Sequence, residues 1–123
     1  MNNKILIVDD DSDSLILQQT ILQRLGYYTQ LAVNGLDAMK IIMEDKPDII
    51  LLDIFMPQMD GFETISILQK KHPEIPVIIV TAGGAKIINK LKEMGIHYHI
   101  QKPISPTKLQ KEIAKCVKVN FKT

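Results

Sequence analysis

The sequence has a single cysteine, no tryptophan and no long apolar stretch. Because Cys116 has no partner within the chain, an internal disulfide is impossible, and a reducing compartment is the default interpretation. No apolar run approaches the roughly 20 residues that a membrane-spanning helix needs. The segment from Met1 to Lys4 leads directly into an apolar run, which leaves no room for a signal peptide. We therefore expect a cytoplasmic protein without membrane insertion.

Charge is unevenly distributed, although the formal net charge is only +1. Residues 1–85 carry six basic and twelve acidic side chains, whereas residues 86–123 carry nine lysines and two glutamates. The simplest interpretation of the basic half is a solvated helix face. A second interpretation is a docking surface for an acidic partner, with Lys90, Lys111 and Lys115 as candidates. Because no recognition module is evident and aromatic content is only 5%, we expect no direct nucleic-acid binding.

Short apolar runs alternate with helical patterns along the whole chain. Residues 5–8, 49–52 and 77–80 are continuous apolar runs, which is typical of strands in a parallel sheet covered on both faces. A length of 123 residues with 46% hydrophobic content fits one globular domain. We predict a three-layer, doubly wound α/β fold of five βα units, with the flavodoxin-like strand order 2-1-3-4-5.

Turn and capping residues set the expected bounds of the elements. The expected strands span about residues 4–8, 27–32, 49–53, 76–80 and 97–102, and the expected helices span about residues 13–25, 35–44, 62–71, 85–94 and 106 onward. Ser12 or Asp13 is the expected N-cap of the first helix, and Gly26 its C-terminal stop. Leu25 is expected on the inner stripe of that helix. Cys116 is expected on the buried stripe of the last helix.

Acidic, hydroxyl and amino side chains stand where the predicted strands end: Asp9 and Asp10 follow the first strand, Asp53 ends the third, Thr81 follows the fourth and Lys102 ends the fifth. The carboxyl ends of parallel strands meet at one edge of a sheet, where open α/β sheets bind ligands. Carboxylates gathered there repel one another and favour binding of a hard divalent cation. We expect this cation to be Mg²⁺, for which Mn²⁺ could substitute. A carboxylate can also accept a phosphoryl group, whose oxygens a lysine and a hydroxyl would bind.

Four motifs at these strand ends resemble the receiver domain of two-component response regulators, the CheY-like family. They are Ile-Leu-Ile-Val-Asp-Asp-Asp at 5–11, Leu-Leu-Asp-Ile-Phe-Met-Pro-Gln-Met-Asp-Gly at 51–61, Val-Thr-Ala at 80–82 and Lys-Pro at 102–103. The resemblance covers almost the whole chain and implies a phosphorelay switch, not an ordinary enzyme. We expect residues 1–123 to form a single receiver domain with no effector domain.

The resemblance also implies partners and metal ligands. A sensor histidine kinase or phosphotransfer protein would donate the phosphoryl group from a phosphohistidine to Asp53, with slow self-dephosphorylation afterwards. Asp10 would bind Mg²⁺ directly, Asp9 largely through water, and Phe55 through its backbone carbonyl, together with Asp53. The downstream target would be another protein.

Thr81 and Lys102 would bind the phosphoryl oxygens in such a domain. In the family, the hydroxyl residue and an aromatic residue of the fifth strand move together and reshape the face of helix 4, strand 5 and helix 5. Here the aromatic position, three residues before Lys102, holds His99. Tyr98 is adjacent but should point to the opposite side of the strand. We therefore expect His99 to take the switch role.

The strand-end residues leave two other classes of function open. An interaction-only pseudo-receiver would never accept phosphate, and the complete set of acidic, hydroxyl and lysine residues argues against it. An enzyme on a similar sheet is the other class. A flavodoxin would need a Ser/Thr/Gly-rich phosphate loop where residues 9–11 are aspartates. A phosphatase with an aspartate nucleophile would need a second acid two residues after it, where Phe55 stands.

Overall fold

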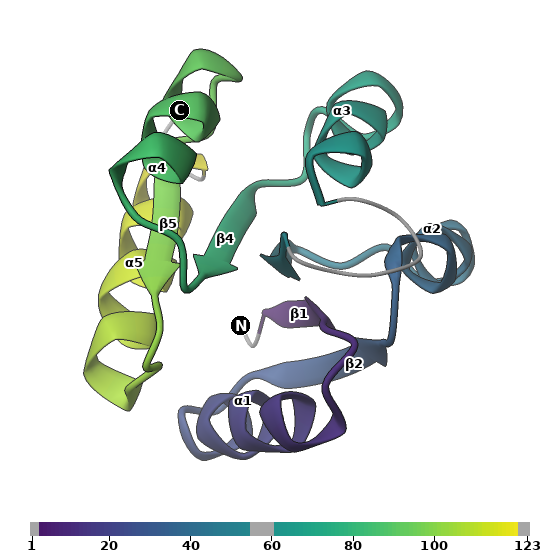
Figure 1. Cartoon of the computed structure of the whole chain (residues 1–123). Coiled ribbons are helices and arrows are strands. Elements are labelled where there is room, and N and C mark those ends of the chain that lie inside the picture. Colours follow the sequence, from purple (N-terminus) through teal and green to yellow (C-terminus); the bar gives the residue numbers. More distant parts are fainter. Residues whose placement is uncertain (1–2, 55–60, 121–123) are drawn as a thin grey trace.

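Five parallel strands form one sheet in the order β2-β1-β3-β4-β5 (Figure 1). The computed structural model describes residues 3–54 and 61–120, with side chains through residue 117. The elements are β1 (Lys4–Val8), α1 (Ser12–Arg24), β2 (Tyr28–Ala32), α2 (Gly35–Glu44), β3 (Ile49–Asp53), α3 (Gly61–Lys71), β4 (Val77–Thr81), α4 (Ala85–Glu93), β5 (Tyr98–Gln101) and α5 (Pro106–Asn120). The predicted α/β class and strand order are confirmed.

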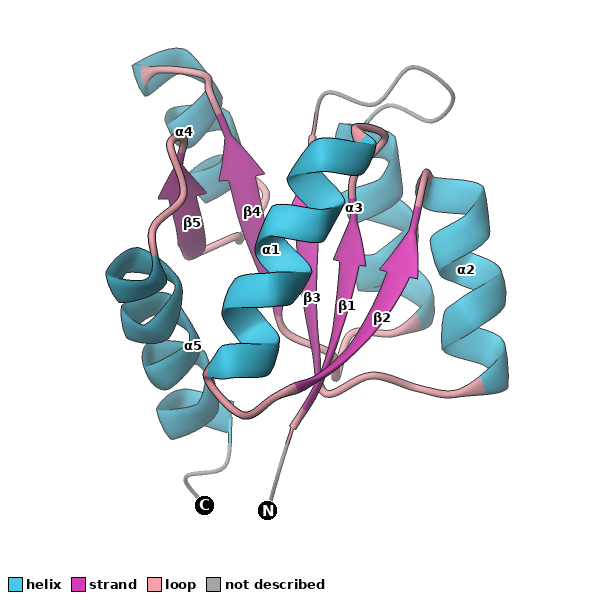
Figure 2. Ribbon diagram, turned by 90° about the horizontal axis from the view of Figure 1, so that it is seen from below, coloured by secondary structure: helices cyan, strands magenta, loops and turns pink. Residues whose placement is uncertain are grey.

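Apolar side chains on both faces of the sheet explain the continuous runs in the sequence. β3 and β4 are buried at all five of their positions because each lies between two strands and under helices on both sides. Along β1, Leu6 packs in the cluster shared with α2, α3 and α4, whereas Ile5 and Ile7 pack in the cluster shared with α1 and α5. Figure 2 shows these helix layers on either side of the sheet. Among the described residues, no helix combines the length and apolar composition needed to cross a membrane.

Small differences from the expected bounds have local causes. Asp11, and not Ser12 or Asp13, caps α1, because its extended backbone lets its carboxylate accept a hydrogen bond from the N–H of Asp13 at 3.3 Å. Leu25, expected on the inner stripe, is 37% exposed because it is the C-cap of α1, whose buried residues end at Leu22. Gly26 has φ +97°, the left-handed conformation expected after a helix.

The strand register brings distant sequence positions to one edge. Val8 of β1 pairs with Leu52 of β3, so Asp9 and Asp53 follow at neighbouring positions. Asp53 in turn pairs with Val80 of β4. All strands run in the same direction, so their carboxyl ends lie along the same edge (Figure 2). The site predicted from the strand ends is therefore assembled by the register of the central strands.

The thiol of Cys116 is expected to be unreactive in the folded protein. The residue is fully buried on α5, and burial together with Glu112 raises the pKa of the thiol from 9.0 to about 12. Iodoacetamide at neutral pH should alkylate Cys116 only after denaturation, which intact mass would show. The raised pKa means that the buried, protonated thiol stabilises the folded state fully below pH 9. This stabilisation is lost as the pH rises toward about 12. Rapid alkylation of folded protein would contradict this placement.

Candidate functional site

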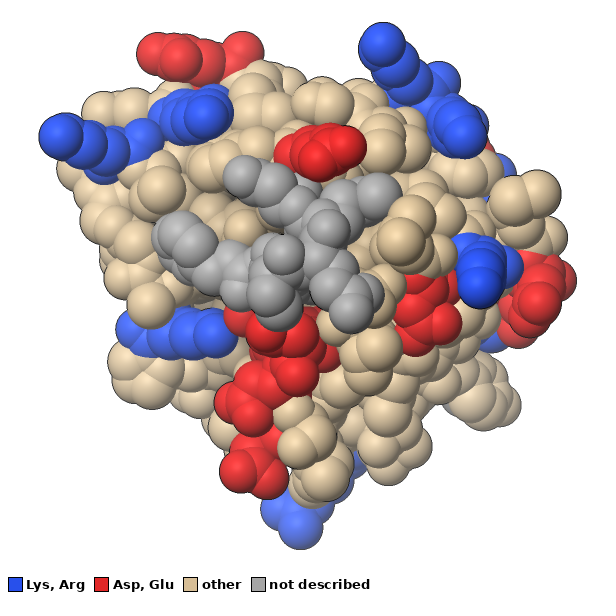
Figure 3. All heavy atoms as spheres, turned by 45° about the vertical axis from the view of Figure 1, so that its right-hand side comes forward, with Lys and Arg blue, Asp and Glu red and all other residues tan. Residues whose placement is uncertain are grey.

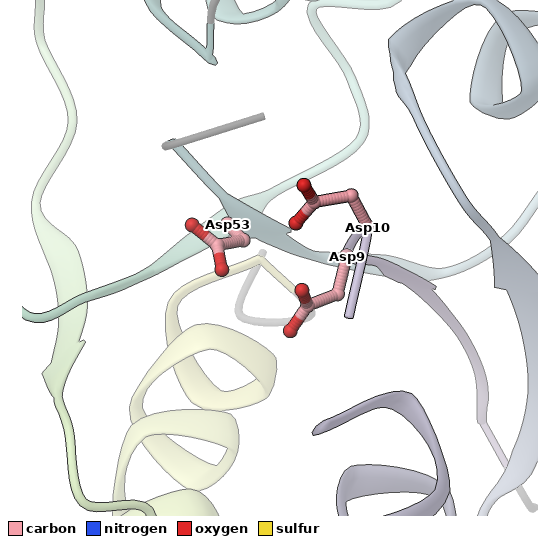
Figure 4. A group of neighbouring side chains, drawn as sticks. All are labelled: Asp9, Asp10 and Asp53. Carbon is pink, nitrogen blue, oxygen red and sulfur yellow. The ribbon is translucent and has the colours of Figure 1, made fainter. Parts of the chain in front are cut away.

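Three aspartates converge at the carboxyl edge of the sheet (Figure 4). One carboxylate oxygen from each of Asp9, Asp10 and Asp53 lies within 4.8 Å of the others. Asp9 and Asp53 are buried, whereas Asp10 is exposed. The carboxylates of Asp9 and Asp10 point from the end of β1 toward Asp53 (Figure 4). The structure thus brings together the three acidic residues that the strand ends predicted.

Hydrogen-bond donors stabilise the fully buried carboxylate of Asp9. Its Oδ1 accepts from the backbone N–H of Asp11 at 3.0 Å, and its Oδ2 accepts from Nε2 of Gln18 at 3.1 Å. Gln18 is only 1% exposed. Sequence reasoning missed this residue, although the signal was present. Gln18 is a polar side chain on the apolar stripe of α1, three residues after Leu15 and four before Leu22. It fixes the orientation of Asp9 as groups around metal ligands commonly do.

Lys102 neutralises the buried carboxylate of Asp53. Its Nζ lies 3.0 Å from Oδ2 of Asp53, and 34% of its side chain remains exposed. Burial alone would lower the pKa of Lys102, but its hydrogen bond to Asp53 and the nearby charges of Asp53, Asp9 and Asp11 raise that pKa above its usual value. Lys102 is therefore a fixed positive charge at neutral pH.

Thr81 is the last residue of β4, the strand that pairs with the end of β3 at Asp53. It is fully buried and lies one position beyond Val80, the register partner of Asp53. Its Oγ1 accepts a hydrogen bond from the N–H of Gly83 at 2.8 Å, and its carbonyl accepts from the N–H of Lys102 at 2.9 Å. The hydroxyl proton of Thr81 can serve as a donor to a further acceptor. Thr81 thus connects the end of β4 to both the next loop and Lys102.

The two remaining predicted site residues are His99 and Phe55. His99 is half-buried on β5, the strand at the edge of the sheet, and pairs with Ile79. Tyr98, its neighbour in sequence, packs in the cluster shared with α1 and α5. Phe55, the predicted backbone ligand, lies outside the described residues.

The donor set fits a hard divalent cation. All the clustered ligand atoms are carboxylate oxygens, which Mg²⁺ prefers, and neither histidine nor cysteine is among them. The exposure of Asp10 leaves room for water in the coordination shell, which Mg²⁺ usually retains. Figure 3 shows acidic side chains gathered on one face of the molecule. Their negative charge would attract a cation to this pocket.

Similar solved structures define the class of protein to which this fold and pocket belong. A CheY-like response regulator receiver domain protein from Methanospirillum hungatei JF-1 matches with a TM-score of 0.89 and 27% identity, over 98% of this chain and 97% of that chain. Chemotaxis protein CheY4 of Vibrio cholerae matches with a TM-score of 0.87 and 25% identity, over 94% and 98% of the two chains. The fold is that of CheY-like proteins.

Sequence comparison then assigns the family. The family model of the response regulator receiver domain matches residues 5–114, and the chain belongs to this family. Sporulation initiation phosphotransferase F of Bacillus subtilis is 39% identical over 116 residues, 94% of each chain. The alkaline phosphatase synthesis transcriptional regulatory protein PhoP of the same organism is 34% identical over 114 residues, and the match spans 92% of this chain but only 48% of PhoP.

Membership fixes the general character of the protein. Receiver domains of two-component response regulators are signalling switches, not ordinary enzymes, and they interact with histidine kinases or phosphotransfer proteins. They bind Mg²⁺ at an acidic pocket, and Asp9, Asp10 and Asp53 form an acidic cluster in this chain.

Proposed function

We propose that this protein accepts a phosphoryl group on Asp53 from a phosphohistidine of a sensor histidine kinase or phosphotransfer protein. The observation that carries the proposal is the 3.0 Å contact between Lys102 Nζ and the buried carboxylate of Asp53, beside Asp9 and Asp10. Burial of a charged acid next to a fixed cation and two further acids costs folding free energy, so a purely structural role would not explain this arrangement. As a site for transferring an anionic group, it supplies both the acceptor and the charge that neutralises the product.

The proposed step exchanges a phosphorus–nitrogen bond for a phosphorus–oxygen bond. An oxygen of Asp53 attacks the phosphorus, the electron pair of the broken bond returns to the imidazole nitrogen, and an acyl phosphate forms. Lys102 then pairs with a phosphoryl oxygen, and the Thr81 hydroxyl donates a hydrogen bond to another. Slow attack by water would later release inorganic phosphate and restore the carboxylate.

Asp10 and Asp53 would hold Mg²⁺ directly, with Asp9 acting largely through water; the backbone of Phe55 is proposed as a further ligand. When bound, the ion supplies positive charge that offsets the carboxylates and the phosphoryl oxygens. The hydrogen bonds from Gln18 and Asp11 keep Asp9 oriented for this purpose. Mn²⁺ would satisfy the same oxygen ligands.

The test is acceptance of phosphate from a small donor. The protein is incubated with acetyl phosphate and Mg²⁺, and its intact mass is measured with and without EDTA. A labile mass gain of one phosphoryl group that requires Mg²⁺ is the expected result. No gain across metals and donors would favour the alternative, a pseudo-receiver that acts only through protein contacts.

Added Mg²⁺ is expected to raise the Tm. Bound Mg²⁺ removes the mutual repulsion among the three carboxylates, which are close together only in the folded state. At a free Mg²⁺ concentration 100 times its Kd, the unfolding free energy should rise by ~2.7 kcal/mol. Thermal unfolding with Mg²⁺ or EDTA measures this shift. Asp10→Asn should reduce the shift and leave metal-free folding largely intact, because Asp10 is exposed. An unchanged shift in this variant would contradict direct binding by Asp10.

A hollow beside the site provides a place for the phosphodonor to approach. It has a volume of about 340 Å³, and Leu17 of α1, Lys102 and Ile104 are among the residues that line it. Leu17 is 51% exposed. An apolar rim beside the charged centre is suited to a protein surface that carries the phosphohistidine. The proposed setting is the cytoplasm, consistent with the single buried thiol.

His99 is proposed to communicate phosphorylation to α4 and α5. It lies on the same side of β5 as Gln101, the register partner of Thr81. His99→Ala is expected to leave phosphorylation intact but to remove most phosphorylation-dependent NMR shifts on α4 and α5. His72→Ala, at a half-buried histidine that directly follows α3, is the control. Full retention of the shifts in His99→Ala would exclude a switch role for this side chain.

A further inference from the structure

The exposed apolar side chains of this protein gather at one end of the sheet. Every exposed large apolar side chain of the described residues lies within residues 16–43, which span most of α1, all of β2 and most of α2. Figure 1 shows β2 at this end of the sheet, between α1 and α2 and away from β5. Tyr28 and Leu31 of β2 are 62% and 36% exposed. Apolar surface gathered around one element commonly marks an interaction site.

β2 is an edge strand, and one of its two hydrogen-bonding sides is open. The N–H of Tyr28 donates to the carbonyl of Asn3 at 3.0 Å, so the backbone of Tyr28 faces β1. Successive residues of a strand direct their backbone groups to alternate sides. Thr29 and Leu31 therefore direct their N–H and C=O groups away from β1, where no other strand of the described chain lies. Such a row of backbone groups is a template for another strand.

Side chains next to this open edge define its length and its border. The N–H of Val33 also points away from β1, but it donates to Oδ2 of Asp37 at 3.1 Å and so ends the open row. On the α1 side, Oγ1 of Thr29 accepts from Nε2 of Gln19 at 3.1 Å. Ile16 lies one helical turn before Gln19 and is 58% exposed, so it borders the same edge. The open edge is thus short, strand-shaped and flanked by an apolar side chain.

The open edge lacks the residues that usually prevent strand pairing between proteins. Natural edge strands commonly carry charged side chains, lysine above all, or proline. Residues 25–36, from the end of α1 to the start of α2, contain neither a charged residue nor proline. β5, the other edge strand, is followed directly by Lys102 and Pro103. A charged partner would gain no ion pair from the β2 edge, whereas an identical uncharged edge can pair with it without repulsion.

We propose that β2 pairs with β2 of a second copy of this chain. Most homo-oligomers are built on two-fold axes, and an axis perpendicular to the sheet makes the two strands antiparallel. With the axis at Gln30, Thr29 of each copy faces Leu31 of the other. Each of these residue pairs exchanges both backbone hydrogen bonds, because both residues direct their groups outward. The two sheets join into one continuous sheet, and the open backbone groups of both edges are satisfied.

The dimer is expected to be reversible and to leave the acidic cluster outside the contact. Five residues of β2 span only ~17 Å, and small interfaces of this kind are typical of transient complexes. Because the strands are antiparallel, the carboxyl edges of the two sheets point in opposite directions. The acidic clusters therefore lie at opposite edges of the joined sheet. The inference does not depend on the proposed phosphorylation of Asp53.

The test is the oligomeric state of the whole chain from micromolar to millimolar concentration, measured by sedimentation velocity. A monomer–dimer equilibrium that persists at raised salt is expected, because the paired edge carries no charge. Leu31→Lys adds a charge of the kind that protects natural edges and should weaken dimerisation by roughly tenfold or more. Met43→Lys makes the same kind of change at an 83% exposed position of α2 and should dimerise as wild type. Circular dichroism shows whether both variants are folded.

Hydrogen exchange of the wild-type protein identifies the paired edge without any substitution. The amides of Thr29 and Leu31 should exchange rapidly in dilute protein. Where about nine-tenths of the chain is dimeric, their exchange should slow by roughly tenfold, because only the monomer exposes them. The amides of Tyr28 and Gln30 face β1 and should be protected at both concentrations.

Several results would overturn the proposal. A protein that is monomeric at every concentration has no such dimer, even if a strand of another protein binds the edge. A dimer that Leu31→Lys leaves unchanged, or new protection confined to amides of other elements, would place the contact on another face. Association that disappears at raised salt would show that ion pairs hold the copies together. None of these results depends on whether Asp53 accepts phosphate, so failure of the proposed function would leave this test unaffected.

Discussion

Asp53→Asn is expected to take up no phosphoryl group under conditions that phosphorylate the wild-type protein. The carboxylate oxygen is the proposed nucleophile, and an amide at that position is neutral and a much weaker one. The loss should be complete within the sensitivity of intact-mass measurement. The fold should survive, because the substitution preserves the shape of the side chain and removes one of three mutually repelling charges.

A nearby acid provides the matched control for this variant. Asp13 is an exposed carboxylate in the first turn of α1, and Asp13→Asn should gain phosphate as wild type does. Circular dichroism would show that both variants are folded. Phosphate uptake by Asp53→Asn at the wild-type level would place the acceptor elsewhere and contradict the assignment.

Gly61→Ala is expected to destabilise the protein and impair phosphorylation together. The N–H of Gly61 donates to the carbonyl of Ile54 at 3.1 Å, and an added Cβ would lie only 2.1 Å from the Ile54 Cα. Because that neighbour is backbone, it cannot rotate away as a side chain could. Overpacking of this kind costs ~1–3 kcal/mol of unfolding free energy, and occasionally more. Ile54 directly follows Asp53, so its displacement also moves the acceptor.

Gly84→Ala separates this clash from a general effect of replacing glycine. A Cβ at Gly84 meets no atom within 4 Å, and its backbone φ of −96° suits any residue. Because Gly84 is the N-cap of α4, where glycine is favoured over alanine, Gly84→Ala should lower the unfolding free energy by at most ~1 kcal/mol. Urea unfolding of both variants measures the difference, and acetyl phosphate measures the activity. Equal stability of Gly61→Ala and wild type would show that this close approach does not constrain the fold.

Much of the fold could be predicted because its signals are local. The run from Ile49 to Leu52 is apolar on both faces of its strand, which required helices on both sides of the sheet. Element bounds were less accurate. β5 ends at Gln101 and not at Lys102, and β4 begins at Val77 and not at Pro76, since the last paired residue depends on the neighbouring strand. The N-cap of α1 could not be chosen from sequence either, because it depends on which of the adjacent polar residues has an extended backbone.

The site was predictable in its members but not in all of its contacts. Parallel strands bring their carboxyl ends to one edge, so Asp9, Asp53 and Lys102 could be expected together from sequence order. The contact of Gln18 with Asp9 could not be assigned, because it depends on the rotation of α1 against the sheet. The roles of these residues in phosphate transfer remain predictions that the experiments above address.

The sequence by itself determined the layered α/β architecture and the identity of the residues at the strand ends, because periodicity and strand direction are encoded by neighbouring residues. Only the tertiary structure decided that Gln101 lies between the loop after Thr81 and Lys108 of α5. That arrangement depends on the register of β5 beside β4 and on how α5 packs against the sheet, and both arise from contacts between segments distant in the chain.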